Sequence, residues 1–135
     1  GQFGTGASFG FSPATRAEGV TPAADPHLPQ PLWFKDYAVD VEQADPDSML
    51  ALYRAALAIR QESLTATRDT TAEQVDMGDD VVAYTRAAVG GRVFTSITNF
   101  GNAPVALPDG SVVLASGPLT PEGQLPTDTS AWVIK

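Results

Sequence analysis

The longest run of hydrophobic residues at helical spacing lies in residues 45–62. With 100° between successive residues, the apolar side chains of this segment cover about half of the helix circumference. These residues are Met49, Leu50, Leu52, Tyr53, Ala56, Leu57 and Ile59. A surface helix that packs on one core shows an apolar stripe of roughly 100°. The pattern therefore predicts one helix with two packing neighbours, and the remaining chain offers material for only one.

The start of this helix also has a signal in the sequence. Asp45 can cap the helix through its carboxylate, and Pro46 suits the first helical position because no hydrogen bond is lost there. We therefore expect the helix to begin at Asp45 and Pro46.

Residues 1–44 show no sustained helical or strand periodicity. They contain five glycines, five prolines and six of the eleven aromatic residues of the chain. A structureless loop of this length is uncommon inside a compact domain, whereas a disordered tail is poor in aromatic residues. The composition favours an ordered loop held by aromatic contacts to another surface, with an unattached tail as the alternative.

From about residue 71 onward, β-branched and aromatic residues stand between turn residues, which is typical of strands. The predicted strands are residues 73–77, 81–86, 92–100, 105–107, 111–115 and 131–135. Glycine-containing turns at residues 78–79, 90–91 and 109–110 supply the positive φ that hairpins need. Alternation within the third strand places Phe94 and Ile97 on opposite faces. The fold class is therefore mostly β with one main helix, and the strands form an antiparallel sheet or a small β-sandwich.

Composition narrows the classes of partner. The 135 residues fit one ordinary domain, and eight basic against sixteen acidic residues give a formal net charge of −8. This charge argues against binding nucleic acid or an anionic membrane surface. The chain has no cysteine, which fits a reducing cytoplasm, and no run of 18 apolar residues that could span a membrane. We expect a cytoplasmic location, and the missing signal peptide adds nothing to this expectation if the chain begins at a cut edge.

Metal and cofactor chemistry has little support. The single histidine, His27, has no second histidine or cysteine with which to form a zinc site, so we expect it to be structural. The acidic turn of Asp76, Asp79 and Asp80 lacks the spacing of a calcium-binding loop, and a solvated hairpin is the simpler interpretation. We expect no metal site and no cofactor.

Catalytic chemistry from side chains has only one weak signal. Asp36, Asp40 and Glu42 alternate ahead of the helix, and paired carboxylates can hydrolyse glycosidic bonds when they lie at the right separation. Spacing within an irregular segment fixes no such distance. From the residues alone, no catalytic constellation is predicted.

A series of short sequence words resembles the C-terminal end of glycoside hydrolase family 13, the α-amylase family. Its similarity is greatest to bacterial α-glucosidases of the oligo-1,6-glucosidase and maltase type. The words are FGFS at 9–12, PHLPQP at 26–31, VEQ at 41–43, DPDSML at 45–50, LYR at 52–54, VVAY at 81–84, NFG at 99–101, LASGPL at 114–119 and LPTDT at 125–129. They keep the order of the family over nearly the whole chain.

The resemblance implies a placement for each part of the chain. Residues 1–44 would be the loop after the last strand of a (β/α)8 barrel, and residues 45–70 its final helix and a linker. Residues 71–135 would be an all-β C-terminal domain, an antiparallel β-sandwich. The catalytic acids of the family lie on earlier barrel strands, so no catalytic residue is expected here. Phe9, Phe11 and Trp33 are the candidates for contact with a sugar.

The resulting hypothesis is a non-catalytic segment of a retaining α-glucosidase that acts on oligosaccharides. Its partner would be the missing N-terminal barrel portion, and it would meet substrate only through that portion. The alternatives are a stand-alone β-sandwich that binds carbohydrate or protein, and a partner chain that assembles with a separate barrel half.

Overall fold

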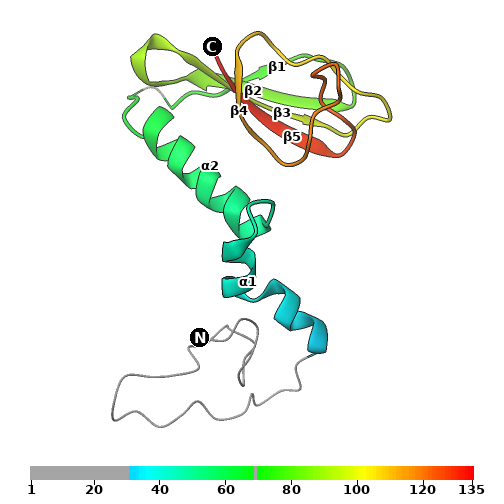
Figure 1. Cartoon of the computed structure of the whole chain (residues 1–135). Coiled ribbons are helices and arrows are strands. Elements are labelled where there is room, and N and C mark those ends of the chain that lie inside the picture. The colour runs from blue at the N-terminus through cyan, green and yellow to red at the C-terminus, as the bar shows by residue number, and fades with distance from the viewer. Residues whose placement is uncertain (1–30, 69) are drawn as a thin grey trace. The chain divides into compact units, whose positions relative to one another are not determined.

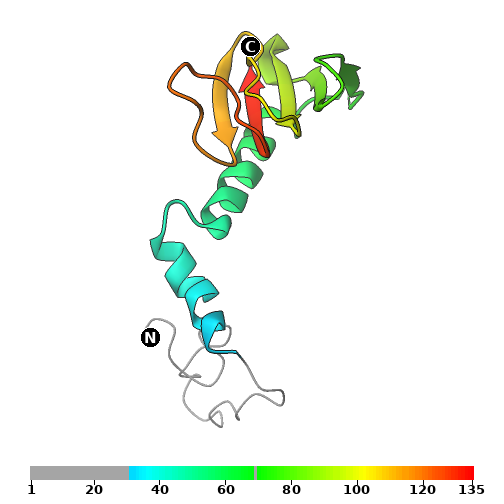
Figure 2. The same cartoon turned by 90° about the vertical axis from the view of Figure 1, so that its right-hand side faces the viewer.

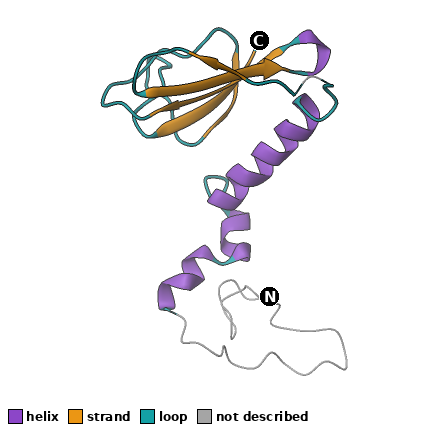
Figure 3. Cartoon of the chain, turned by 180° about the vertical axis from the view of Figure 1, so that it is seen from behind, coloured by secondary structure: helices purple, strands orange, loops and turns teal. Residues whose placement is uncertain are grey.

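The computed structural model of the chain describes residues 31–68 and 70–135. Two compact units are present, Gly1–Arg54 and Ala55–Lys135. Phe9, Phe11 and His27 lie outside the described residues. The described part is mostly antiparallel sheet with one main helix, which confirms the predicted fold class (Figure 3).

Two short helices occupy residues 32–44, where periodicity indicates no helix. The first is the 3-10 helix η1 (Leu32–Tyr37), and the second is α1 (Val39–Ala44) (Figure 1). The backbone N–H of Ala38 donates to the carbonyl of Lys35 and closes η1. Both helices have six residues, which is shorter than the window over which helical periodicity can be recognised.

The main helix, α2, spans Met49–Ser63. The Oγ of Ser48 accepts a hydrogen bond from the backbone N–H of Ala51 at 3.1 Å and caps the helix. The carboxylate of Asp45 instead accepts from the backbone N–H of Asp47 at 2.9 Å, within the turn that precedes the helix. The prediction that Asp45 caps the helix and that Pro46 opens it is therefore wrong. The Asp45 carboxylate is used within the turn, and Ser48 caps the helix instead.

Five strands form a single antiparallel sheet in the order β1-β2-β3-β5-β4. They are β1 (Glu73–Val75), β2 (Val81–Ala87), β3 (Val93–Asn99), β4 (Ser111–Ala115) and β5 (Thr129–Ile134). Figure 2 shows β5 (red) beside β4 (orange). The predicted strand at residues 105–107 is reduced to a single bridge between Val105 and Leu125.

Three of the predicted turns contain glycines in the left-handed region. The φ angles of Gly78, Gly90 and Gly110 are 107°, 76° and 141°. Non-glycine residues rarely adopt these angles, so the predictions from glycine position are confirmed.

Each face of the sheet carries its own hydrophobic cluster. On one face, the buried residues of β2, β3 and β5 pack with loop residues that form a second layer. That cluster contains Val81, Ala83, Ile97, Ala131 and Leu125, with Val105, Leu107 and Leu119 at its border. On the other face, Phe94 and Ile134 pack with Ala88. Phe94 and Ile97 therefore lie on opposite faces, as alternation predicts.

Candidate functional site

An exposed aromatic cluster occupies η1. The ring centroids of Trp33 and Phe34 lie 4.5 Å apart, and those of Trp33 and Tyr37 lie 5.8 Å apart, both with edge-to-face geometry. Trp33 is 58% exposed and Tyr37 is 60% exposed. Trp33 is thus accessible to a ligand, and its contact with a sugar stays a prediction. Because Phe9 and Phe11 lie outside the described residues, the three predicted sugar-contacting residues are not seen together.

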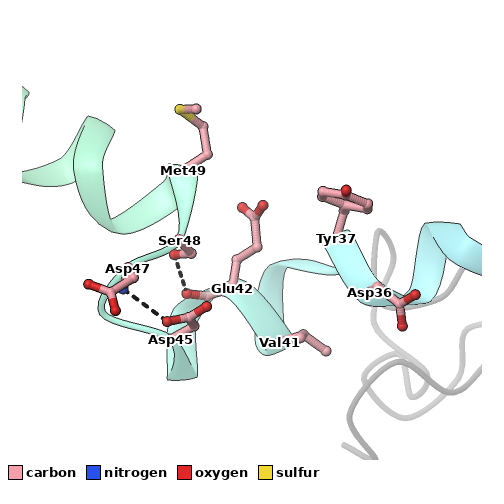
Figure 4. Close-up of a pocket in the computed structure, with 8 residues that line it drawn as sticks. All are labelled: Asp36, Tyr37, Val41, Glu42, Asp45, Asp47, Ser48 and Met49. Carbon is pink, nitrogen blue, oxygen red and sulfur yellow. Dashed lines mark hydrogen bonds between the residues drawn. The ribbon is translucent and has the colours of Figure 1, made fainter. Parts of the chain in front are cut away.

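An open pocket of about 500 Å³ lies next to this cluster in the first unit (Figure 4). Its wall comes from η1, α1, the turn that follows α1, and the first residue of α2. The lining residues are Asp36, Tyr37, Val41, Glu42, Asp45, Asp47, Ser48 and Met49. Tyr37 belongs to both the aromatic cluster and the pocket.

Two hydrogen bonds fix the chain reversal behind the pocket. The hydroxyl of Ser48 donates to the carbonyl of Glu42 at 2.6 Å, while the carboxylate of Asp45 holds the backbone N–H of Asp47 (Figure 4). Ser48 is buried although it is a serine, because both hydrogen-bonding functions of its hydroxyl are used within the chain. The pocket floor is therefore a defined turn.

The pocket lining has one type of ionisable group. Its four carboxylates belong to Asp36, Glu42, Asp45 and Asp47, and no lysine, arginine or histidine lines it. Carboxylates accept hydrogen bonds from hydroxyl or amide groups, and a pair of them hydrolyses a glycosidic bond only at a suitable separation. Of the three predicted acids, Asp36 and Glu42 line this one pocket.

Neither acidic segment forms a metal site in the described parts of the chain. No group of three or more histidine, cysteine, aspartate or glutamate residues within residues 31–68 and 70–135 has metal-binding geometry. Asp76, Asp79 and Asp80 are exposed, and the carboxylate of Asp76 accepts from the backbone N–H of Gly78 at 3.1 Å. This interaction serves the turn. None of the helices described is long and apolar enough to cross a membrane.

The helix α2 carries an exposed apolar stripe at four-residue spacing. Met49, Tyr53 and Leu57 are 59%, 63% and 59% exposed. Residues four apart lie on one face of a helix, so these side chains form a continuous strip of surface. We call Met49, Tyr53 and Leu57 the α2 stripe. Large apolar side chains in such a row are typical of a surface that another element covers.

Sequence reasoning missed the pocket itself. Tyr37 and Ser48 are eleven positions apart and meet only because α1 and the following turn reverse the chain. The sequence gives no sign of α1, because a helix of six residues is too short to show helical periodicity.

Solved structures of other proteins are similar to this chain. The trehalulose synthase MutB from Pseudomonas mesoacidophila MX-45 is 26% identical, with a TM-score of 0.61 and coverage of 82% of this chain. A protein assigned as an alpha amylase from Salmonella typhimurium is 19% identical over 76% of this chain, with a TM-score of 0.52, and supports the fold alone. This chain resembles glycoside hydrolase family 13 enzymes. No protein-family model matches the sequence, and no curated protein matches it.

The family 13 resemblance covers only part of those enzymes. The chain spans 22% of the trehalulose synthase and 17% of the Salmonella protein. The part that this chain matches is therefore a small share of each of these enzymes.

Proposed function

We propose that this chain is the non-catalytic C-terminal segment of a retaining α-glucosidase of family 13. The parent enzyme acts on α-glucosidic bonds of oligosaccharides and is of the oligo-1,6-glucosidase or maltase type. In this proposal α2 is the final helix of the catalytic barrel, and the five-stranded domain covers the barrel. The acids that carry the double displacement lie in the barrel portion, which is the partner of this chain.

The α2 stripe is the observation that carries the proposal. Complete burial of a large apolar side chain stabilises a protein by about 1.5–3 kcal/mol, so three such side chains represent a large share of a typical stability of about 5–15 kcal/mol. Met49, Tyr53 and Leu57 are all more than half exposed. A barrel surface packed on α2 would recover that free energy.

The chemistry of the described residues agrees with a non-catalytic role. The carboxylates of Asp45 and Asp76 accept hydrogen bonds from backbone N–H groups of their own turns, and the resemblance implies that the catalytic acids lie in the barrel portion. The resemblance to family 13 supplies the reaction class, since retaining enzymes of this kind use two carboxylates in a preorganised barrel.

Two activity measurements test the proposal. The purified chain is incubated with maltose, isomaltose and an aryl α-glucoside, and no turnover above a mock preparation is expected. The polypeptide encoded directly upstream of Gly1 is then added. Restored turnover is expected, and the variant Tyr53→Glu should lower it because a carboxylate replaces an aromatic ring in the α2 stripe. Turnover by the chain alone would contradict the proposal.

The alternative is a stand-alone module that binds carbohydrate, and the exposure of Trp33 favours it. Affinity electrophoresis through starch or dextran separates the two functions. A carbohydrate-binding module would be retarded, and Trp33→Ala would abolish the retardation. Phe100→Ala is the matched control, because Phe100 is a similarly exposed aromatic residue, 62% exposed, in the other unit. Unretarded migration of the unmodified chain would exclude this alternative.

A further inference from the structure

The turn that leads into β4 contains the one Asp-Gly sequence of the chain, Asp109–Gly110. After any aspartate, the side-chain carboxyl carbon can reach the nitrogen of the next peptide bond and close a five-membered ring. Glycine carries no side chain beside that nitrogen, so it obstructs the approach least. Asp109–Gly110 is therefore the pair at which the covalent chain meets the lowest steric barrier to this reaction.

The structure leaves both reacting groups of this pair accessible. The Asp109 side chain is 89% exposed, and Gly110 is exposed as well. Within residues 31–68 and 70–135, no hydrogen bond from the N–H of Gly110 is found. The Asp109 carboxylate lies 3.2 Å from the Nζ of Lys135, and an exposed ion pair of this kind restrains a side chain only weakly. The carboxyl carbon and the peptide nitrogen are thus free to approach each other.

Two other aspartates among the described residues precede small hydroxyl residues, and the fold restrains both pairs. In Asp47–Ser48, the N–H of Ser48 donates to a carbonyl of the same turn at 3.2 Å, and Ser48 is buried. In Asp128–Thr129, Thr129 is buried and belongs to the ladder between β5 and β3. A peptide unit held in a turn or a ladder reacts only after local opening, which costs free energy. The fold therefore separates Asp109 from these two candidates.

We infer that Asp109–Gly110 is a site of spontaneous isoaspartate formation. The nitrogen of Gly110 attacks the side-chain carboxyl carbon of Asp109, a C–N bond forms, and one water molecule leaves with the carboxyl OH and the amide proton. Water then adds to either carbonyl of the resulting succinimide and opens the ring. One opening restores aspartate. The other passes the main chain through the former side chain, and the former main-chain carbonyl becomes the free carboxylate.

The modification changes the chain where it enters the sheet. An isoaspartyl linkage adds one methylene group to the main chain directly before Gly110. Gly110 already lies so close to β5 that an added Cβ would be 2.7 Å from the carbonyl oxygen of Ile134. The next residue, Ser111, forms the first pair of the β4–β5 ladder with Ile134. A longer main chain at this point disturbs that close approach, so the isoaspartyl form has a weakened β4–β5 edge.

Ageing of the full 135-residue chain at physiological temperature and neutral pH tests the inference. Isoaspartate is quantified by transfer of a labelled methyl group from S-adenosylmethionine with a protein L-isoaspartyl methyltransferase, and peptide mapping locates the label. We expect the label at Asp109 to exceed that at Asp47 and at Asp128. A label at Asp109 no greater than at the other two would overturn the inference.

A parallel sample in guanidinium chloride separates the effect of the fold from that of the sequence. We expect Asp109 to react in the folded chain within about threefold of its rate in denaturant, whereas Asp47 and Asp128 react more than about tenfold slower when folded, because their segments must first open. A folded rate for Asp109 more than about tenfold below its rate in denaturant would show that the fold protects the site, and would overturn the inference.

A matched pair of variants identifies the reacting carboxylate. Asp109→Glu keeps the charge, but its ring closure needs a six-membered ring, which forms far more slowly. Asp79→Glu is the control, because Asp79 is also an exposed aspartate in a turn. We expect the label in the peptide around residue 109 to be lost in Asp109→Glu and unchanged in Asp79→Glu. We also expect the Tm to fall on ageing in the control and to stay constant in Asp109→Glu. An unchanged label in Asp109→Glu would overturn the inference, and an equal fall in Tm for both variants would contradict the effect on the β4–β5 edge.

Discussion

The hydroxyl of Ser48 donates to the carbonyl of Glu42 at 2.6 Å and thereby ties the end of α1 to the start of α2. The same oxygen accepts the backbone N–H of Ala51 and caps α2. One buried side chain therefore sets both the first turn of the main helix and the chain reversal that lines the pocket. Tyr37 and Met49 reach a common cavity because of this turn.

Replacement of Ser48 tests this relationship. Ser48→Ala removes the helix cap and the contact with Glu42, and loss of a cap costs about 0.5–2 kcal/mol. We expect faster hydrogen exchange at the first amides of α2. Ser48→Thr retains a hydroxyl and should keep most of the protection. Equal exchange in the alanine and threonine variants would show that the hydroxyl does not hold the turn.

Asn99 joins β3 to the loop layer of the β domain. Its side chain is completely buried, donates to the carbonyls of Ala103 and Leu125 at 2.9 and 3.1 Å, and accepts from the backbone N–H of Gly101 at 2.9 Å. Asn99→Ala removes these three hydrogen bonds and leaves the buried N–H of Gly101 without its partner, whereas the carbonyl of Leu125 still accepts from the N–H of Val105. An unsatisfied buried group costs about 1–3 kcal/mol and a lost hydrogen bond about 0.5–1.5 kcal/mol, so we expect a loss of about 2–4 kcal/mol in the free energy of unfolding.

Urea denaturation of unmodified chain and variant measures this loss. The control is Asn102→Ala, which makes the same substitution at an exposed position three residues away and should change stability by less than about 0.5 kcal/mol. A similar midpoint for both variants would refute a structural role for the Asn99 amide.

Gly110 occupies a position that no other residue fits without strain. Its φ is 141°, and an added Cβ would lie 2.7 Å from the carbonyl oxygen of Ile134. Gly110→Ala should therefore destabilise the β4–β5 edge of the sheet by about 1–3 kcal/mol. Gly117→Ala is the control, because an added Cβ there meets only Thr129 at 3.9 Å. Thermal unfolding of the two variants measures the difference, and a Tm for Gly110→Ala at or above that of Gly117→Ala would contradict the prediction.

The single ion pair between described residues is expected to contribute little. The Nζ of Lys135 lies 3.2 Å from a carboxylate oxygen of Asp109, and both side chains are largely exposed. Exposed pairs of this kind contribute about 0–1 kcal/mol because water screens them. We expect Asp109→Asn to change the free energy of unfolding by less than about 0.5 kcal/mol in low salt, as measured by urea denaturation. A loss above about 1 kcal/mol would show a larger structural role.

Local patterns in the sequence predict the sheet well and the first unit poorly. The strand from Ser111 to Ala115 follows from alternation and from the glycine turn before it. The predicted strand at residues 105–107 pairs only once, through Val105 with Leu125. Pairing depends on the partner segment, and sequence alternation in one strand does not contain that information.

The start of α2 shows a second limit of local reasoning. Asp45 and Ser48 are both good capping residues, and the sequence alone does not decide between them. The turn between α1 and α2 decides, since it places the Asp45 carboxylate on the N–H of Asp47. The pocket likewise depends on a reversal that follows a helix of only six residues, so its lining residues share no spacing that could reveal them.

The α2 stripe leads to a prediction for the chain without its partner. Leu57 is 59% exposed, so Leu57→Gln removes apolar surface from water at little cost to folding. Exposed apolar strips promote association, and we expect the unmodified chain to self-associate at high concentration and Leu57→Gln to do so less. Sedimentation velocity over a range of concentrations measures this. Ile97→Val, a conservative change in the core, should lower the free energy of unfolding by about 0.5–1.5 kcal/mol without reducing association. A chain that stays monomeric at every concentration would show that the α2 stripe is tolerated in water, and the need for a barrel to cover it would then lose its physical basis.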